Sequence, residues 1–419
     1  MIQKEKALVI GVNLNDQPDF RESMEELQNL AIACEFDVVG KAEQNLKTIN
    51  PAYYIGHGKV EEIKSSLIET EAKLIIFNNE LSPSQIRNLE EELDTKVLDR
   101  TSLILEIFAK RAKTREAKLQ VEVARLQYSL PRLIGSNESL GRQSGGVGTK
   151  NRGSGEKKLE LDRRKIEEKI AELNKELGSL DNERNTQKKM RSKTDLPSVA
   201  LVGYTNAGKS TLMNAMVELF QKSESKKVFE KNMLFATLET SVRKILLPDN
   251  KSILLSDTVG FVNKLPHDLI KAFRSTLDEV READLLLHVI DFSHSNYKQQ
   301  IEITNETLKQ IGAKDIPIIY VFNKADLTPM DIPLVDGGNV YLSSKEKIGM
   351  NELIQVINKK VFNQYIDCTM LIPYDQGKIV AYLNENAHVK SVSYEADGTL
   401  LIVECREQDY KKLKDFVYH

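Results

Sequence analysis

The sequence predicts an α/β protein with three parts: an N-terminal α/β domain that carries a long antiparallel helical hairpin, a doubly wound sheet, and a small C-terminal α+β domain. Three observations predict this. Short apolar runs alternate with amphipathic stretches in two separate parts of the chain, and two long stretches between those parts carry helical apolar stripes. The 419 residues are also too many for one compact core, so we expect about three folded units.

The first hundred residues have the pattern of a small parallel sheet with crossover helices. The strand candidates are ALVIGV, DVVG, AKLIIFNN and KVLD, and the amphipathic stretches between them are RESMEELQNLAIA, GKVEEIKSSLIET and SPSQIRNLEEEL. Ser82 and Pro83 predict the start of the last helix, as its cap and first-turn proline. We expect this domain to span residues 1–100.

Residues 101–192 predict a helical hairpin. Apolar residues recur at three- and four-residue steps from 101 to 130, which indicates one long helix with an apolar stripe. A second helix over 156–190 can pack antiparallel on the first, because its apolar residues are seven positions apart: Leu159, Ile166, Leu173 and Leu180. The glycine-rich stretch GGVGTKNRGSGEKKLELDRR, residues 145–164, is then the tip of the hairpin.

Charge is unevenly distributed along the chain. The formal net charge is −3, but residues 108–193 contain 22 Lys and Arg against 12 Asp and Glu, so the hairpin is basic within an acidic protein. Such a segment favours a polyanion as binding partner. The alternative interpretation is a helix with a solvated charged face.

Residues 193–363 predict the doubly wound sheet, and residues 364–419 predict the small α+β domain. The runs SVALVG, SILLSD, LLLHVIDF, IPIIYVF and VYLSS have the continuous hydrophobicity of strands that are buried on both faces. No stretch approaches the roughly 18 apolar residues of a membrane span, so we expect a cytoplasmic protein without a membrane-spanning helix. The three cysteines lack metal-ligand spacing and are expected to be reduced thiols.

The stretch GYTNAGKST matches G-x-x-x-x-G-K-[ST] directly after an apolar strand, as a phosphate-binding loop requires. In such a loop the main-chain N–H groups surround the phosphates, Lys209 brings positive charge to the β and γ phosphates, and the Ser210 hydroxyl binds Mg²⁺. We expect every residue of this stretch to contact the nucleotide: Gly203, Tyr204, Thr205, Asn206, Ala207, Gly208, Lys209, Ser210 and Thr211.

Two further stretches complete the predicted phosphate and Mg²⁺ site. DTVG offers the Asp257 carboxylate to Mg²⁺ through water and the Gly260 amide to the γ-phosphate. In FATLET, Thr237 is the candidate switch threonine, which binds Mg²⁺ and the γ-phosphate in the triphosphate state, and Thr240 is the second choice. The neighbours of these residues are included in the predicted contacts: Phe235, Ala236, Thr258 and Val259.

The stretch NKAD, residues 323–326, predicts the base. The Asp326 carboxylate can accept hydrogen bonds from the ring N–H and the exocyclic amine of guanine, whereas adenine offers neither donor there, so GTP and GDP are favoured. The other predicted base contacts are Asn323, Lys324 and, in SSK after the next strand, Ser343, Ser344 and Lys345. Residues 193–363 therefore predict a P-loop domain that hydrolyses GTP to GDP and phosphate.

The position after D-x-x-G differs from that of many GTPases, which have a glutamine there to orient the attacking water. This chain has Phe261, whose ring cannot orient water, so we expect a low basal rate; the alternative is that Phe261 only packs under the switch. Asn206 suggests that K⁺ completes the site, as in several GTPases that lack the glutamine, although an ordinary loop cap explains it equally. The candidate catalytic residues are Lys209, Thr237, Gly260 and Asn206.

Several stretches together resemble the HflX family of ribosome-associated GTPases. They are YYIGHGKVEEI at 53–63, FNNELSPSQIRNLE at 77–90, VLDRTSLILEIFAKRAKTREAKLQVEVARLQYSLPRL at 97–133, the glycine-rich stretch, GYTNAGKST and SDTVGFVNKLPHDLI. The resemblance covers almost the whole chain and is weakest at the C-terminus. Ser154 stands where the family usually has proline, and Lys157 and Lys158 stand where less basic residues are common.

The resemblance implies a GTPase that binds the large ribosomal subunit and, in its GTP form, splits stalled or idle 70S ribosomes into subunits under stress. We expect the protein to be a monomer. The expected contacts with ribosomal RNA are Arg142, Lys150, Arg152, Lys157 and Lys158. Two alternatives remain. One is a GTP-dependent regulatory switch for a protein or membrane partner, and the other is an RNA-remodelling enzyme with a second nucleotide site near GHGK at 56–59.

Overall fold

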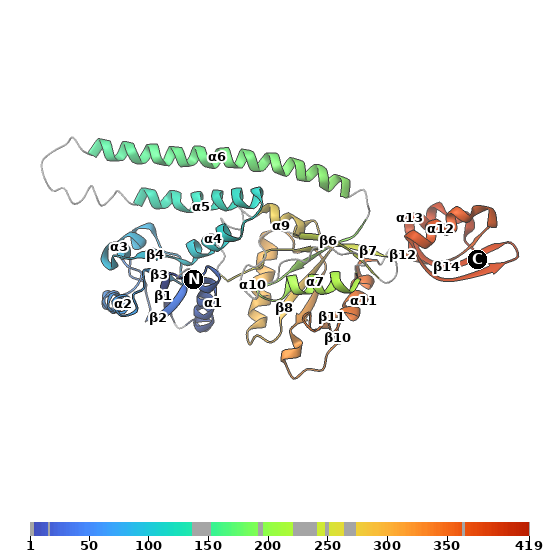
Figure 1. Ribbon diagram of the computed structural model, residues 1–419, viewed down its shortest axis with the longest axis horizontal. Helices are drawn as coiled ribbons and strands as arrows, with labels where there is room; N and C mark the ends of the chain where they lie inside the picture. Colours follow the sequence, from blue (N-terminus) through green and yellow to red (C-terminus); the bar gives the residue numbers. More distant parts are fainter. Residues whose placement is uncertain are drawn as a thin grey trace. The chain divides into compact units, whose positions relative to one another are not determined.

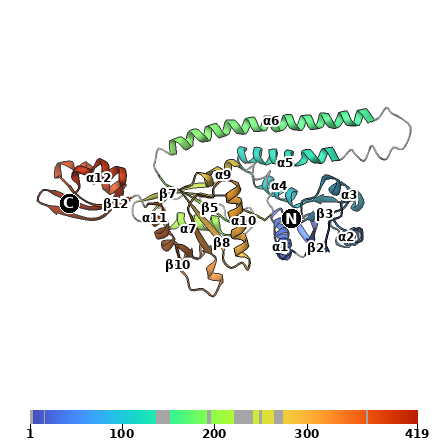
Figure 2. The same ribbon diagram turned by 180° about the vertical axis from the view of Figure 1, so that it is seen from behind.

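The computed structural model describes eight stretches of the chain: 4–15, 17–135, 152–191, 196–220, 241–247, 251–263, 274–362 and 365–418. The chain divides into two compact units, and each is described by itself. The first unit holds the N-terminal sheet and the hairpin, and the second holds the larger sheet and the C-terminal domain (Figure 1, Figure 2).

A four-stranded parallel sheet forms the centre of the first unit. Its strands are β1 (Lys6–Leu14), β2 (Asp37–Leu46), β3 (Leu74–Phe77) and β4 (Lys96–Leu98), in the order β2-β1-β3-β4. The side chains of β1 are buried without interruption from Ala7 to Val12, because helices cover both faces of this strand. The prediction of an N-terminal α/β domain is confirmed.

Four helices cover this sheet: α1 (Phe20–Ala33), α2 (His57–Thr70), α3 (Pro83–Leu93) and α4 (Arg100–Arg111). Ser82 begins α3 as predicted. Its Oγ accepts a hydrogen bond from the Gln85 N–H at 3.3 Å, and its own N–H donates to Gln85 Oε1 at 2.9 Å. This reciprocal pair, with Pro83 in the first turn, satisfies N–H groups that a helix start leaves without partners.

The single long helix predicted from 101 to 130 is two helices, so that prediction is wrong. The chain leaves α4 at Ala112, which has extended backbone, and α5 spans Arg115–Gly135. Thr114 causes the second start, because its Oγ1 accepts a hydrogen bond from the Ala117 N–H at 3.2 Å in the manner of a helix cap. Apolar periodicity did not show this break, since buried residues recur at helical spacing on both sides of it.

The second hairpin helix, α6, spans Arg152–Arg191 and lies beside α5 in both views (Figure 1, Figure 2). The predicted stripe is its protected face: Ile166, Ile170, Leu173, Leu177 and Leu180 are half-buried or buried. The prediction that all of 145–164 forms the tip is wrong, because the residues from Arg152 onward are helical. A long helix tolerates glycine at a cost of about 1 kcal/mol each, so Gly153 and Gly155 do not stop it.

A seven-stranded sheet of order β10-β11-β9-β8-β5-β7-β6 forms the centre of the second unit. Its strands are β5 (Ser198–Val202), β6 (Ser241–Leu246), β7 (Ser252–Asp257), β8 (Leu285–Asp291), β9 (Ile318–Asn323), β10 (Leu334–Asp336) and β11 (Asn339–Tyr341). The associated helices are α7 (Lys209–Phe220), α9 (Arg274–Arg281), α10 (Tyr297–Gln310) and α11 (Met350–Val361). The five inner strands are parallel, as in the predicted doubly wound fold.

The hairpin of β10 and β11 was not predicted. Its turn consists of Gly337 and Gly338, both with positive φ, and it joins Asp336 to Asn339. Two successive positive φ values are typical of the two-residue turn that matches strand twist, so the letters DGGN carried a hairpin signal.

The C-terminal domain is a three-stranded antiparallel sheet with two helices, as predicted. Strands β12 (Tyr365–Ile372), β13 (His388–Glu395) and β14 (Gly398–Arg406) lie in the order β12-β14-β13, and α12 (Gly377–Asn386) and α13 (Glu407–Lys412) pack on the sheet. The three cysteines of the chain are free thiols. Among the helices of the described stretches, none combines the length and the apolar character needed to cross a membrane.

Candidate nucleotide site

The predicted phosphate loop joins β5 to α7, and Lys209 is the first residue of the helix. Gly203 has φ +144°, and a Cβ there would lie 2.2 Å from the Val289 carbonyl oxygen of β8. Gly208 has φ +95°, and a Cβ there would lie 2.2 Å from Asn323 Nδ2. Both positions therefore need glycine for backbone conformation and for close approach. The loop places main-chain N–H groups at a helix N-terminus, which favours anions.

Lys209 is buried inside this loop. Its Nζ donates hydrogen bonds to the carbonyl oxygens of Gly203 at 3.0 Å and Tyr204 at 2.8 Å. Burial lowers the pKa of Lys209 to about 8, against the opposing effect of the Asp257 carboxylate. A phosphate group would stabilise the charged form that burial disfavours, so the site suits an anionic ligand.

Ser210 and Asp257 meet although they lie far apart in the sequence. Ser210 Oγ donates to Asp257 Oδ2 at 2.7 Å, and Asp257 is fully buried at the end of β7. A hydroxyl oxygen and carboxylate oxygens are the ligand types that Mg²⁺ prefers, so this pair fits a Mg²⁺ ion. Within the described stretches there is no group of three His, Cys, Asp or Glu side chains that could hold a different metal.

The residues after Asp257 pack directly on the phosphate loop. A Cβ at Gly260 would lie 2.9 Å from Thr205 Cα and 3.0 Å from Lys209 Nζ, so glycine allows this approach. The Phe261 N–H donates to the Gly203 carbonyl at 3.1 Å, and its carbonyl accepts from the Thr205 N–H at 2.7 Å. The Phe261 ring is 2% exposed. This side chain belongs to the interior and offers no polar atom to a water molecule.

Asn323 connects the predicted base motif to the phosphate loop. Its Nδ2 donates to the Ala207 carbonyl at 2.9 Å, and its Oδ1 accepts from the Ser344 N–H at 2.9 Å. One amide therefore holds the loop, the end of β9 and the SSK stretch in register. Asp326 is exposed, so its carboxylate is accessible to a base.

Asp291 is a site residue that the sequence reasoning missed. It ends β8, and its Oδ2 lies 2.6 Å from Nζ of Lys324, whose φ of +59° is left-handed. The ion pair fixes the Lys324 side chain beside the base motif. The only sequence signal was its place at the carboxyl end of a buried strand, where ligands gather in α/β sheets.

The remaining predicted contacts are placed as follows. The described ones lie on the phosphate loop, at the start of α7, after β7, or after β11: Thr205, Asn206, Thr211, Thr258, Val259, Ser343 and Lys345. Asn206 is exposed and has φ +63°. Some predicted residues lie outside the described stretches: Arg142, Lys150, Phe235, Ala236, Thr237 and Thr240. The last three predicted RNA contacts lie on the first turns of α6: Arg152, Lys157 and Lys158.

Three family models match the chain in sequence order. They are the GTP-binding GTPase N-terminal model over residues 21–109, the GTP-binding GTPase Middle Region model over 111–191, and the 50S ribosome-binding GTPase model over 198–324. A GTPase HflX of Caldanaerobacter subterraneus subsp. tengcongensis is 42% identical, with 99% of this chain and 94% of that protein covered. This chain belongs to the HflX family of GTPases.

A second member, the GTPase HflX of Escherichia coli, is 36% identical, with 94% of this chain and 92% of that protein covered. Among solved structures, a GTP-binding protein of Sulfolobus solfataricus in complex with GDP is 26% identical, with a TM-score of 0.44 over 86% of this chain and 99% of that one. As a member of the HflX family the chain is an enzyme that hydrolyses GTP, as the motifs predicted.

His288 lies on β8 beneath the site of this HflX-family chain. It is 1% exposed, and its ring centroid lies 5.3 Å from that of Tyr320. Burial first, and the charge of Lys209 second, lower the pKa of His288 to about 3. The imidazole is therefore neutral in the folded protein at ordinary pH, which suits a core residue rather than a proton carrier.

Gly203→Ala is expected to weaken GDP binding by about 100-fold or more, because its Cβ would displace the Val289 carbonyl and strain the loop. Gly312→Ala is the matched control, since Gly312 also has positive φ but a Cβ there would meet nothing within 4 Å. Titration with a fluorescent GDP analogue measures both. Equal affinities for the two variants would contradict the close-approach argument.

The stability of the protein is expected to fall between about pH 6.5 and pH 5 through His288. The unfolded chain binds a proton there below about pH 6.5 while the folded chain does not, which costs up to about 1.4 kcal/mol per pH unit. His288→Phe should reduce this slope by about that amount in urea unfolding. An unchanged slope in His288→Phe would show that His288 does not titrate as described.

Proposed function

We propose that this protein binds the large ribosomal subunit in its GTP form and separates 70S ribosomes into subunits, and that hydrolysis to GDP releases it. The observation that carries the proposal is the match of residues 198–324 to the 50S ribosome-binding GTPase model. We take the domains of the protein as residues 1–100, 101–192, 193–363 and 364–419. We place its action in the cytoplasm, where idle or stalled ribosomes arise under stress.

The nucleotide assignments of the proposal rest on the sequence motifs and are supported by the geometry of the site. Lys209 would bind the β and γ phosphates, Ser210 and Asp257 would hold Mg²⁺, the latter through water, and Asp326 would recognise guanine. Support comes from the hydrogen bond between Ser210 and Asp257 and from the amide of Asn323, which brings the base motif to the phosphate loop. Thr237 is proposed as the switch threonine on its sequence position alone. Mg²⁺ would supply positive charge at the phosphates when bound.

The catalytic step is proposed to depend on the ribosome. Phe261 is buried, its side chain has no polar group, and its main chain is hydrogen-bonded to Gly203 and Thr205. This residue therefore cannot orient the attacking water. The intrinsic rate is then low, and a group supplied by the ribosome, or K⁺ held near Asn206, completes the site. With a low intrinsic rate, GTP stays intact until the protein has bound the ribosome.

The basic hairpin is proposed to contact ribosomal RNA. Its cations on α6 include the exposed Arg163, Arg164 and Lys165 as well as the predicted contacts at the start of this helix. Cations that neutralise RNA phosphates release counterions, which makes binding strongly dependent on salt. A second nucleotide site near GHGK gains no support from the structure, because Lys59 is ion-paired with Glu62 at 2.7 Å.

With a non-hydrolysable GTP analogue, the protein is expected to convert purified 70S ribosomes into 30S and 50S particles, measured by sucrose-gradient sedimentation. A variant in which residues 141–151 are replaced by a Gly-Ser linker of equal length should bind the analogue normally but leave 70S intact. If the wild-type protein binds nucleotide and leaves 70S intact, ribosome splitting is wrong and the regulatory-switch alternative takes its place.

GTP hydrolysis is expected to be at least about ten-fold faster in KCl than in NaCl at equal ionic strength, because K⁺ would supply the charge that an arginine provides elsewhere. Asn206→Ala should remove the difference between the two salts, and its nucleotide affinity is measured alongside so that the rates are compared at saturation. Equal rates in both salts would contradict a role for K⁺. The left-handed backbone at this position would then account for the asparagine.

A further inference from the structure

The last turn of α5 is held on the N-terminal domain by buried polar contacts. We propose that Asp99, Tyr128 and Arg132, here called the anchor, fix the end of α5 for the binding of ribosomal RNA, and that Arg132 is a positioning residue rather than an RNA contact. This inference rests on the proposed function for the binding of RNA, and on the geometry of the described residues for the anchor itself.

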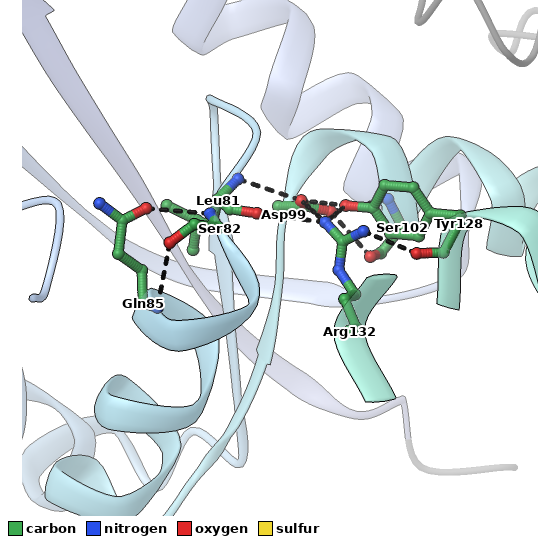
Figure 3. A network of polar contacts seen from close by, with 7 residues as sticks. All are labelled: Leu81, Ser82, Gln85, Asp99, Ser102, Tyr128 and Arg132. Atoms are coloured by element: carbon green, nitrogen blue, oxygen red, sulfur yellow. Dashed lines mark hydrogen bonds and ion pairs between the residues drawn. The ribbon is translucent and has the colours of Figure 1, made fainter. Parts of the chain in front are cut away.

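The Asp99 carboxylate is the centre of the anchor (Figure 3). Asp99 follows β4 and is fully buried, and its Oδ1 caps α4 by accepting from the Ser102 N–H at 2.9 Å and the Ser102 hydroxyl at 2.7 Å. Its Oδ2 accepts from the Leu81 N–H at 3.2 Å, from Arg132 Nη2 at 3.0 Å and from the Tyr128 hydroxyl. One carboxylate thus joins three segments: the chain after β3, the start of α4, and α5.

Arg132 makes further contacts that use the planar shape of its guanidinium. Nη1 donates to the Tyr128 carbonyl at 2.8 Å, Nη2 donates to the Leu81 carbonyl at 3.2 Å, and the group lies 3.3 Å from the centre of the Tyr128 ring. The fork of donors and the stacking are properties of arginine that lysine lacks. Burial and the neighbouring Asp99 charge raise the pKa of Tyr128, so its hydroxyl stays protonated and donates.

The place of the anchor in the chain gives it its role. Pro131 lies inside α5 and has no N–H to donate, so the final turn of this helix lacks one backbone hydrogen bond. Arg132, the next residue, ties that turn to Leu81 and Asp99 instead. The predicted RNA contacts Arg142 and Lys150 follow this turn in the sequence, and a fixed turn reduces the conformational entropy that the chain loses on binding RNA.

Arg132 differs in this respect from Arg125 on the same helix. The Arg125 side chain is 43% exposed and pairs with Glu106 at 2.6 Å, whereas the Arg132 side chain is 20% exposed and its partner Asp99 is fully buried. If an RNA phosphate paired with Arg132, the buried Asp99 carboxylate would lose its cation, which is costly in free energy. Arg125 therefore offers a matched control of equal charge and similar position.

The first measurement is amide hydrogen exchange of the full-length free protein, in the peptide that covers residues 126–135. Arg132→Lys and Tyr128→Phe should each raise its exchange rate by at least about ten-fold, because they open the last turn of α5, while Arg125→Lys should not. Thermal unfolding of each variant verifies that the chain is folded at the working temperature. Wild-type exchange rates in both anchor variants would overturn the anchor.

The second measurement is the affinity for purified large subunits with the non-hydrolysable GTP analogue, at several KCl concentrations. Arg132→Lys and Arg132→Gln should both lower the affinity about ten-fold and leave the slope of log K against log salt unchanged. Lys150→Gln, a proposed phosphate contact, should instead reduce the slope by about one. Arg125→Gln should bind almost as wild type does.

The outcomes separate the two proposals. If Arg132→Lys binds as wild type does while Arg132→Gln loses affinity and slope, Arg132 contacts RNA and the positioning role is wrong. If the exchange rates change but neither Arg132 variant alters affinity, the anchor does not serve binding and the inference falls. If the wild-type protein does not bind large subunits, the proposed function fails, and with it the positioning role, whatever the exchange rates show.

Discussion

The nucleotide site depends on the side-chain amide of Asn323. This group donates to the phosphate loop at Ala207 and accepts from the main chain at Ser344, and it does so at a point where a Cβ on Gly208 would collide with it. The amide is buried, so an alternative partner for either of its polar ends would have to come from the protein itself. The amide therefore ties the phosphate loop, the end of β9 and the SSK stretch to one another.

The electrostatics of the site follow from the same close packing. Lys209 and Asp257 are both buried; Lys209 begins α7 after the loop that follows β5, and Asp257 is the last residue of β7. Burial makes the charge of Lys209 costly, and a bound phosphate and metal ion would offset this cost. Phe261 is buried and its side chain is apolar, so this position offers no group that would orient a nucleophile.

The sequence was sufficient for the fold class, because runs such as SVALVG and LLLHVID are buried on both faces and can form only inner strands. It was insufficient where one hydrogen bond decides the path of the backbone. At Thr114 a helix cap divides a continuous apolar stripe between two helices. In the site, the motifs named residues that lie together at the phosphate loop, but not Asp291, whose ion pair with Lys324 depends on the left-handed backbone of that lysine. Contacts of this kind are set by tertiary geometry, and no local pattern encodes them.

The same limit applies to charge. Counting Lys and Arg made the whole hairpin a candidate for RNA binding, yet the arginines of the stretch 97–133 are largely used within the protein. Arg100 is 2% exposed and pairs with Glu26 and Asn78, Arg125 pairs with Glu106, and Arg132 pairs with Asp99. An arginine with a buried carboxylate partner supports architecture, because removing it would strand that charge. In the described part of the hairpin, the exposed cations include Arg163, Arg164 and Lys165 on α6, and the acids paired with Arg163 and Lys165 are themselves partly exposed.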